Sequence, residues 1–148
     1  MSVSTRAKQK NSSTYVLDEQ VGFLMRLAAQ RHAATFHRLA PFGLTPTQFA
    51  ALVKLAERGP CSQNELGRRT AMDVATIKGV VDRLRKKGLV EPEADPNDKR
   101  RSILSISGDH ADIVPSLYQA GHEISEETLK PLDAAERATF LELLKKLT

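Results

Sequence analysis

The sequence of 148 residues has a single cysteine and no long hydrophobic run. Because Cys61 has no second cysteine in the chain, it cannot form an intrachain disulfide, which fits a reducing compartment. No apolar stretch approaches the roughly 20 residues that a membrane span needs, and the N-terminus lacks the apolar segment of a signal peptide. We therefore expect a cytoplasmic protein.

The sequence also lacks the patterns that carry catalysis. It has no nucleophile with a neighbouring base, no carboxylate pair at pocket spacing and no glycine-rich phosphate loop. None of the four histidines stands three or four residues from another, so no metal site is predicted. We therefore expect neither an enzyme nor a bound cofactor. Cys61 is interpreted as a small turn residue between Pro60 and Ser62, with a redox role as the alternative.

The net charge of +4 is unevenly distributed. Residues 1–14 carry three bases and no acid, residues 15–61 have an excess of two bases, and residues 62–107 carry ten bases against seven acids. Residues 108–148 carry four bases against eight acids. A polyanionic partner would therefore meet the middle of the chain. A solvated surface of mixed charge explains the same counts, so charge alone does not decide.

Hydrophobic periodicity predicts how the chain begins to fold. Residues 1–14 are polar, basic and aperiodic, and we expect them to form a disordered basic arm. Apolar residues recur at helical spacing from residue 16 to residue 40, which predicts one long helix within residues 15–43. Residues 45–48, Thr-Pro-Thr-Gln, form a capping box with proline at the first helical position, and predict a second helix that ends at residues 59–60.

A helix-turn-helix is predicted within residues 44–107. Residues 62–65, Ser-Gln-Asn-Glu, are a second capping box and open a short helix to about Arg69. A tight turn at residues 70–72 then leads into a helix that runs from about residue 74 to residue 87. Two helices so close in sequence are typical of a helix-turn-helix.

A β-hairpin and further helices complete the prediction. Two short strands lie at residues 89–94 and 102–107, and the tip between them is basic and rich in turn residues, as in a wing. Helical spacing returns in residues 108–148, with Pro115 as a kink or late start and Asp133 as the cap of a last helix. The predicted fold is mainly α with a small β-wing: a winged helix-turn-helix with further helices at both ends.

The helix at residues 74–87 buries one stripe and presents small residues on its outer face, which suits close approach to base edges in the major groove. An ordinary amphipathic helix has the same pattern. The three adjacent cations of the hairpin tip contribute to no core, however, and are expected to bind phosphates or the minor groove. The candidate DNA-binding residues are Gln63, Asn64, Ala75, Thr76, Lys78, Gly79, Arg83, Lys86, Asp98, Lys99, Arg100 and Arg101.

Five segments follow one another in a specific order: Leu44-Thr45-Pro46-Thr47-Gln48-Phe49, Asn64-Glu65-Leu66-Gly67-Arg68-Arg69, Val81-Asp82-Arg83-Leu84, Gly88-Leu89-Val90 and Asp95-Pro96-Asn97-Asp98-Lys99-Arg100. Together they resemble the MarR family of bacterial winged helix-turn-helix regulators, over residues 16–148. Pro92 and Glu93 depart from the family, whose members often carry arginine there. A backbone contact made by relatives is therefore in doubt, and the proline indicates an edge strand.

The resemblance implies a transcriptional repressor that binds double-stranded, pseudo-palindromic operator DNA as a homodimer. It also implies that the first and the last two helices dimerise, through the region that includes the acidic residues 108–148. Release by a small aromatic acid is implied as well, such as a hydroxylated benzoate or a pyridine carboxylate. Because Cys61 lies outside the usual region of the family's redox cysteines, ligand control is the stronger expectation.

The candidate ligand-binding residues are Arg31, His32, Thr35, His37 and Arg38 on the first helix. The two arginines suit a carboxylate, which a guanidinium binds in a bidentate fork. A solvated helix face or a salt bridge between subunits explains the same residues. The main alternative function is a winged-helix adaptor that binds protein without DNA. An adaptor has little use for three projecting cations, and a salt-dependent shift assay on duplex DNA separates the two functions.

Overall fold

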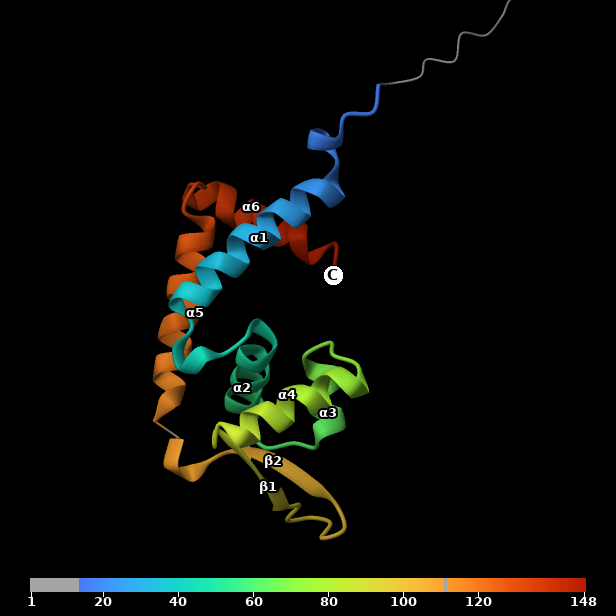
Figure 1. Ribbon diagram of the computed structural model, residues 1–148, viewed down its shortest axis with the longest axis vertical. Coiled ribbons are helices and arrows are strands. Elements are labelled where there is room, and N and C mark those ends of the chain that lie inside the picture. The colour runs from blue at the N-terminus through green and yellow to red at the C-terminus, as the bar shows by residue number, and fades with distance from the viewer. Residues whose placement is uncertain (1–13, 111) are drawn as a thin grey trace, which may run out of the picture.

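The computed structural model describes residues 14–110 and 112–148, and it is mainly helical with a small β-hairpin (Figure 1). In chain order the elements, with η for a short 3₁₀ turn, are η1 (Leu17–Glu19), α1 (Val21–Leu39), η2 (Pro41–Gly43), α2 (Pro46–Arg58), α3 (Gln63–Arg69), α4 (Val74–Lys86), β1 (Val90–Ala94), β2 (Ser102–Ile106), η3 (Gly108–His110), α5 (Ile113–Leu129) and α6 (Ala134–Lys145). The predicted fold class is confirmed. The predicted basic arm lies outside the described residues apart from Thr14. None of the helices described is both long enough and apolar enough to cross a membrane.

The first helix is interrupted near its beginning. A short turn, η1, precedes Gln20, whose backbone is extended (φ −86°, ψ 136°), and α1 starts at Val21. The Gln20 side chain donates a hydrogen bond from Nε2 to the carbonyl of Val16 at 3.0 Å. The side chain thereby supplies a partner for a backbone carbonyl outside the regular helix. The expectation of one continuous helix from residue 16 is therefore wrong at its first turn.

Helices α2, α3 and α4 form most of the main hydrophobic core, which the hairpin and the start of α5 complete. The capping box of α2 is confirmed: Thr45 Oγ1 accepts from the Gln48 amide, and Gln48 Oε1 accepts from the Thr45 amide, both at 3.3 Å. Leu52, Leu66 and Leu84, one from each helix, are 0 % exposed. Because these side chains pack against each other, the core fixes α4 with one face inward and the other toward solvent.

The close packing of α3 against α4 requires a small residue within α3. A Cβ on Gly67 would lie 3.1 Å from Ile77 Cγ2 and 3.2 Å from the Met72 carbonyl oxygen, closer than ordinary contact. Ala71 turns the chain with a positive φ of 55°, and the Met72 amide donates to the Gly67 carbonyl at 2.9 Å. Glycine at position 67 thus lets the two helices of the predicted helix-turn-helix cross closely.

The hairpin consists of two strands, and an isolated bridge pairs one of them with residue 61. β1 and β2 are antiparallel, with Pro92 opposite Leu104. On the other side of β2, Cys61 forms an isolated bridge to Leu104, with backbone hydrogen bonds of 3.2 and 2.7 Å. The interpretation of Cys61 as a turn residue is therefore wrong, because this backbone pairs with a strand far along the chain. β1 lies at the edge of the sheet, where proline, which has no N–H to donate, is tolerated.

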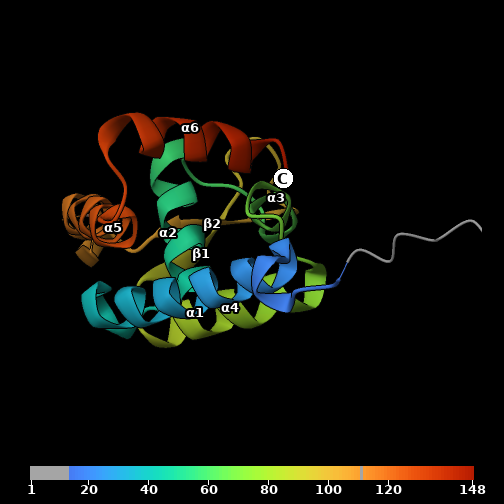
Figure 2. The same cartoon turned by 90° about the horizontal axis from the view of Figure 1, so that it is seen from above.

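We call α1, α5 and α6 the helical frame and residues 44–107 the head, although the start of α5 packs into the core of the head through Ile113 and Leu117. Figure 2 shows α1 and α6 extending from the side where α5 lies. Pro115 lies in the first turn of α5, so the late start is the correct alternative for this proline. Asp133 and Glu136 form the predicted cap of α6, with reciprocal hydrogen bonds of 3.0 and 2.9 Å. None of the residues of α6 is buried.

Candidate nucleic-acid interface

The N-terminal turn of α4 is held in place by its cap. Asp73 Oδ1 accepts a hydrogen bond from the Thr76 amide at 2.7 Å. This hydrogen bond holds the pKa of the Asp73 carboxyl below its usual range, so the cap is ionised at neutral pH. Ile77 is buried, whereas Ala75, Thr76 and Lys78 are exposed. The structure thus presents these three candidate residues on the solvent side of a fixed helix end.

The remaining candidates on α4 lie toward solvent as well. Lys78 Nζ lies 3.5 Å from Asp82 Oδ2, with exposed side chains on both sides. An exposed pair of this kind contributes little to stability, so Lys78 can exchange its partner for a phosphate or a base edge. Gly79 is half-buried, and Arg83 and Lys86 are exposed. The outer face of α4 therefore combines small residues with cations that the fold does not require.

Helix α3 carries an ion-pair network beside this face. Ser62 Oγ accepts from the Glu65 amide at 3.2 Å, but the Glu65 carboxylate does not return the bond to Ser62. It pairs instead with Arg68 and Arg69, so only half of the predicted capping box forms. The hydrogen bond from Arg68 is the main reason that the pKa of Glu65 is lowered. Glu65 thus holds two arginines in place while itself ionised.

The tip of the hairpin is a folded turn and presents its cations outward. The Arg100 amide donates to Asp98 Oδ1 at 3.0 Å, and the Arg101 amide donates to the Asp98 carbonyl at 3.0 Å. Asp98 therefore braces the backbone of the turn, through main-chain groups. Lys99, Arg100 and Arg101 are exposed, and none of them forms an ion pair with any residue that the structure describes. Three cations thus remain available to an external anion.

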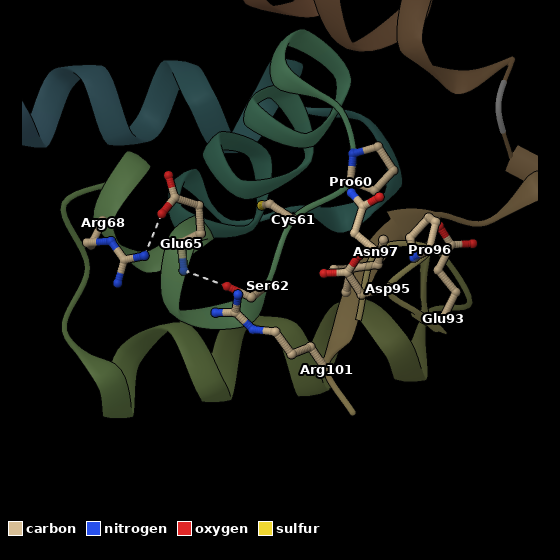
Figure 3. Close-up of a pocket in the computed structure, with 11 residues that line it drawn as sticks. Pro60, Cys61, Ser62, Glu65, Arg68, Glu93, Asp95, Pro96, Asn97 and Arg101 are labelled. Carbon is tan, nitrogen blue, oxygen red and sulfur yellow. Dashed lines mark hydrogen bonds and ion pairs between the residues drawn. The ribbon is translucent and has the colours of Figure 1, made fainter. Parts of the chain in front are cut away.

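A polar cavity of about 490 Å³ lies between α3 and the hairpin. Figure 3 shows Arg101 reaching from the hairpin toward Ser62, with Arg68 on the other side of Glu65. Glu93 also lines the cavity, so its charge is mixed. The two arginines come from segments that are distant in sequence, and the fold places both beside one opening. A phosphate near this opening would meet two guanidinium groups.

Arg68 was missed by the sequence analysis as a candidate contact. Its side chain is 69 % exposed, one helical turn after the candidate Asn64. Asn64 is exposed and Gln63 is half-buried. The i, i+4 spacing of Asn64 and Arg68 is the signal in the sequence that places both on one face of α3.

Cys61 is poorly suited to sensing oxidants. The side chain is 7 % exposed, and burial raises the pKa of its thiol, an effect that the charge of Arg69 partly offsets. The reactive species is the thiolate, which a raised pKa makes scarce at neutral pH. Nothing in the described structure assigns this thiol another function: no group of three or more potential metal ligands occurs among the described residues.

Three of the candidate ligand residues on α1 contact the C-terminal end of α5. Arg31 donates from Nη1 to the Thr128 carbonyl at 2.7 Å and from Nη2 to the Glu127 carbonyl at 3.2 Å. His32 Nδ1 lies 2.8 Å from Thr128 Oγ1, and Arg38 Nη2 lies 3.7 Å from Glu127 Oε1. Arg31 thereby caps carbonyls that the helix end leaves without partners, whereas Arg38 makes only a loose pair.

The other two candidate ligand residues differ in exposure, since Thr35 is buried and His37 is exposed. Of the five candidates, His32 is the one that lines a large groove. This groove has a volume of about 690 Å³ and runs between α1, α5 and α6. Its walls are mainly aliphatic and aromatic, and include Leu24, Phe140 and Leu144, so His32 and Thr128 are among its few polar groups.

Comparison with known proteins identifies close relatives of this chain. A sequence model of the MarR family matches residues 42–101. The HTH-type transcriptional repressor NicR of Pseudomonas putida is 40% identical over 138 residues, which are 93% of this chain and 87% of NicR.

Solved structures agree with this match. A probable transcriptional regulator from Pseudomonas aeruginosa is 50% identical, with a TM-score of 0.85 over 90% of this chain and 100% of that one. BpsR of Bordetella bronchiseptica, whose DNA binding is regulated by 6-hydroxynicotinic acid, is 36% identical, with a TM-score of 0.81 over 90% of this chain and 96% of that one.

Proposed function

The chain belongs to the MarR family of transcriptional regulators, and from this premise we propose that it represses transcription by binding a pseudo-palindromic operator as a homodimer, until a small aromatic carboxylate releases it. The relatives are regulators without enzymatic activity, so the expectation of a non-enzyme is confirmed at the level of the family. The operator, the dimer and the effector are each supported by different parts of the molecule.

The operator proposal rests on one observation: the capped N-terminal end of α4 and the basic hairpin tip both lie on the side of the head away from α5 (Figure 1). In winged helix-turn-helix proteins such a helix enters the major groove, and cations on a wing contact phosphates or the minor groove. Thr76 and Lys78 are accordingly proposed to contact bases, and Lys99, Arg100 and Arg101 the backbone. The other predicted contacts, including Gln63 and Asn64, are proposed to position the head.

The homodimer proposal rests on the unpaired apolar surface of the helical frame. Val21, Leu143 and Leu147 are 65 %, 52 % and 69 % exposed, and α6 buries none of its side chains. An apolar surface of this extent marks an interaction site. A second copy of the chain would bring its own α1 and α6. Each copy would then cover the groove of the other, as a two-fold interface requires. Two heads then call for two half-sites, about 10 base pairs apart.

The effector proposal combines the relatives with the chemistry of the frame. BpsR responds to 6-hydroxynicotinic acid, a pyridine carboxylate, which supports an aromatic acid as the effector class here. Arg38 is 60 % exposed in a loose pair with Glu127, so an added carboxylate can displace that partner. His32 at the groove supplies a second polar contact, while Arg31 already holds the end of α5. We propose that the acid binds near these three residues.

A shift assay tests the operator proposal. Arg100→Ala should weaken binding on all duplexes and lower the dependence of log K on salt by about one unit per lost phosphate contact. Thr76→Ala or Lys78→Ala should also change which operator substitutions are tolerated, by about 1–3 kcal/mol at the contacted base. Lys145→Ala, which removes one positive charge from α6, is the matched control. Equal losses for all three variants on operator and random DNA would contradict the assignment of contacts.

Calorimetry tests the effector proposal. 6-Hydroxynicotinic acid and hydroxybenzoates are titrated into the free protein and into its operator complex. Because coupling is reciprocal, an inducer that lowers operator affinity 5- to 150-fold must bind the complex more weakly by the same factor. Equal affinities exclude that acid as the inducer. Wild-type affinity in Arg38→Ala and His32→Ala would place the binding site elsewhere.

A further inference from the structure

One valine of the head is exposed where no packing accounts for it. Within residues 44–107, all of which the structure describes, Val74 is the only large hydrophobic side chain in the exposed class, at 69 %. It is the first residue of α4. Helix propensity does not explain a valine at this position, because valine is a weaker helix former than residues such as alanine, leucine or glutamate. The core does not explain it either, since the buried stripe of α4 begins at Ile77.

A single exposed valine is ordinary on a protein surface, so its surroundings carry the argument. Asp73 fixes the first turn of α4 through its bond to the Thr76 amide, and thereby fixes the backbone that carries Val74. Lys78 follows one turn later on the same side of the helix. Ala75 and Gly79 are too small to hold the helix away from a surface that it approaches. The N-terminal turn of α4 therefore presents the apolar side chain of Val74, followed one turn later by the cation of Lys78.

We infer that Val74 recognises a thymine by contact with its C5-methyl group in the major groove. This inference rests on the proposed function, in which α4 enters that groove. The thymine methyl is the one apolar group that base pairs present there, and aliphatic side chains are its usual partners. The inference predicts a thymine at one position in each half-site of the operator, related by the two-fold axis of the dimer.

The test removes the methyl from the DNA. The probe is the duplex that the wild-type protein selects from a random library, and each thymine is replaced by deoxyuridine, symmetrically in the two half-sites. At the thymine that Val74 contacts, the change should lower the affinity of the wild-type protein about fourfold per half-site, or about fifteenfold for both half-sites. About fourfold is what burial of one methyl group contributes. Val74→Ala should bind the thymine duplex more weakly than wild type by a similar factor, and replacing thymine by uracil should not lower its affinity further. This is a double-mutant cycle between protein and DNA.

Two controls separate the methyl contact from general effects. Lys78→Ala should bind more weakly but retain the full effect of uracil. Val74→Ala should keep the wild-type salt dependence, because it removes no charge. Circular dichroism of Val74→Ala should match the wild type, since the residue is exposed.

Several outcomes would overturn the inference. It fails if no thymine-to-uracil change affects the wild-type protein, if the selected site holds no thymine in its half-sites, or if Val74→Ala remains as sensitive as wild type. In each of these cases the wild-type protein still binds duplex DNA in a salt-dependent manner, and the proposed function stands. Absence of such binding on every duplex would instead overturn the proposed function itself, and the inference with it.

Discussion

The head and the helical frame differ in how completely each buries its apolar side chains. Leu52, Leu66 and Leu84 of the head are 0 % exposed. Leu141 and Leu147 of the frame are 44 % and 69 % exposed. The head, together with Ile113 and Leu117 at the start of α5, therefore has a buried core, whereas α1 and α6 present apolar side chains that this chain leaves exposed. One chain thus carries a well-packed unit beside an exposed apolar surface, and the proposed association would stabilise that surface.

The two regions are joined by specific contacts. The ring of Phe36 in α1 packs edge-on against Phe49 in α2, with centroids 5.5 Å apart. Lys87, at the end of α4, donates from Nζ to the carbonyls of Phe42 and Gly43, each at 3.0 Å. These carbonyls lie in η2, the turn between α1 and the head. A shift of the frame could reach α4 through this turn, so these contacts are one route by which the proposed effector would act on the head.

The sharpest difference between the regions should appear on core truncation. Leu52→Ala leaves a cavity in the head, and we expect it to lower the free energy of unfolding by about 2–5 kcal/mol in urea titrations. Leu147→Ala, in the frame, should change the stability of the isolated chain by less than about 0.5 kcal/mol. Equal losses for the two variants would contradict the difference in packing between the head and α6.

The converse test concerns association. Leu141→Lys places a charge on the groove wall of α6 in both copies of a dimer, and we expect dimerisation to weaken about 100-fold, equivalent to about 3 kcal/mol. Sedimentation over a concentration series measures the effect. Ala138→Lys introduces the same charge at an exposed position of α6 outside the groove and is the control. A dimer unchanged by Leu141→Lys would place the interface elsewhere.

A smaller effect is expected where the regions meet. Lys87→Met removes the two hydrogen bonds to η2 while keeping the aliphatic chain, and should lower the free energy of unfolding by about 1 kcal/mol. The same variant should reduce the factor by which an effector weakens operator binding, because one link between frame and head is gone. Lys145→Met is the matched control. An unchanged coupling factor would show that the proposed coupling does not depend on this link.

The smallest effect concerns pH and the head. Because the pKa of Asp73 is lowered by its bond to the Thr76 amide, the cap contributes its full stability above the ordinary carboxyl pKa. That contribution is lost as the pH falls through the lowered pKa. Asparagine caps helices equally well but does not titrate there. Melting curves of Asp73→Asn between neutral and acidic pH should therefore fall less steeply than those of wild type. Parallel curves would contradict a titrating cap.

Local signals predicted much of the fold. The predicted caps at Thr45 and Asp133 fix where α2 and α6 begin, because each depends on residues within three positions of the cap. The capping box at Ser62 formed only in part, since Glu65 found better partners in two arginines. That outcome depends on a competition between charge-assisted bonds that spacing alone does not rank.

Contacts between distant segments were beyond prediction. Arg31 was predicted to bind a carboxylate, and its closest partners are carbonyls of Thr128 and Glu127, 97 and 96 residues away. Cys61 was predicted in a turn, and its backbone pairs with Leu104. The residues next to Arg31 and Cys61 in the sequence do not predict which distant residue each one contacts. Both pairings exist only because the packed helices bring the segments together.

Residue type and short spacing are enough to set the order of helices and strands, the stripe that α4 buries and the charge of the hairpin tip. Tertiary structure decided which of those features work together. It brought Arg68 and Arg101 to one opening, left Val74 exposed at the end of α4, and tied Lys87 to η2. The physical reason is that burial and long-range contact depend on how whole helices pack, which no short segment of the sequence specifies.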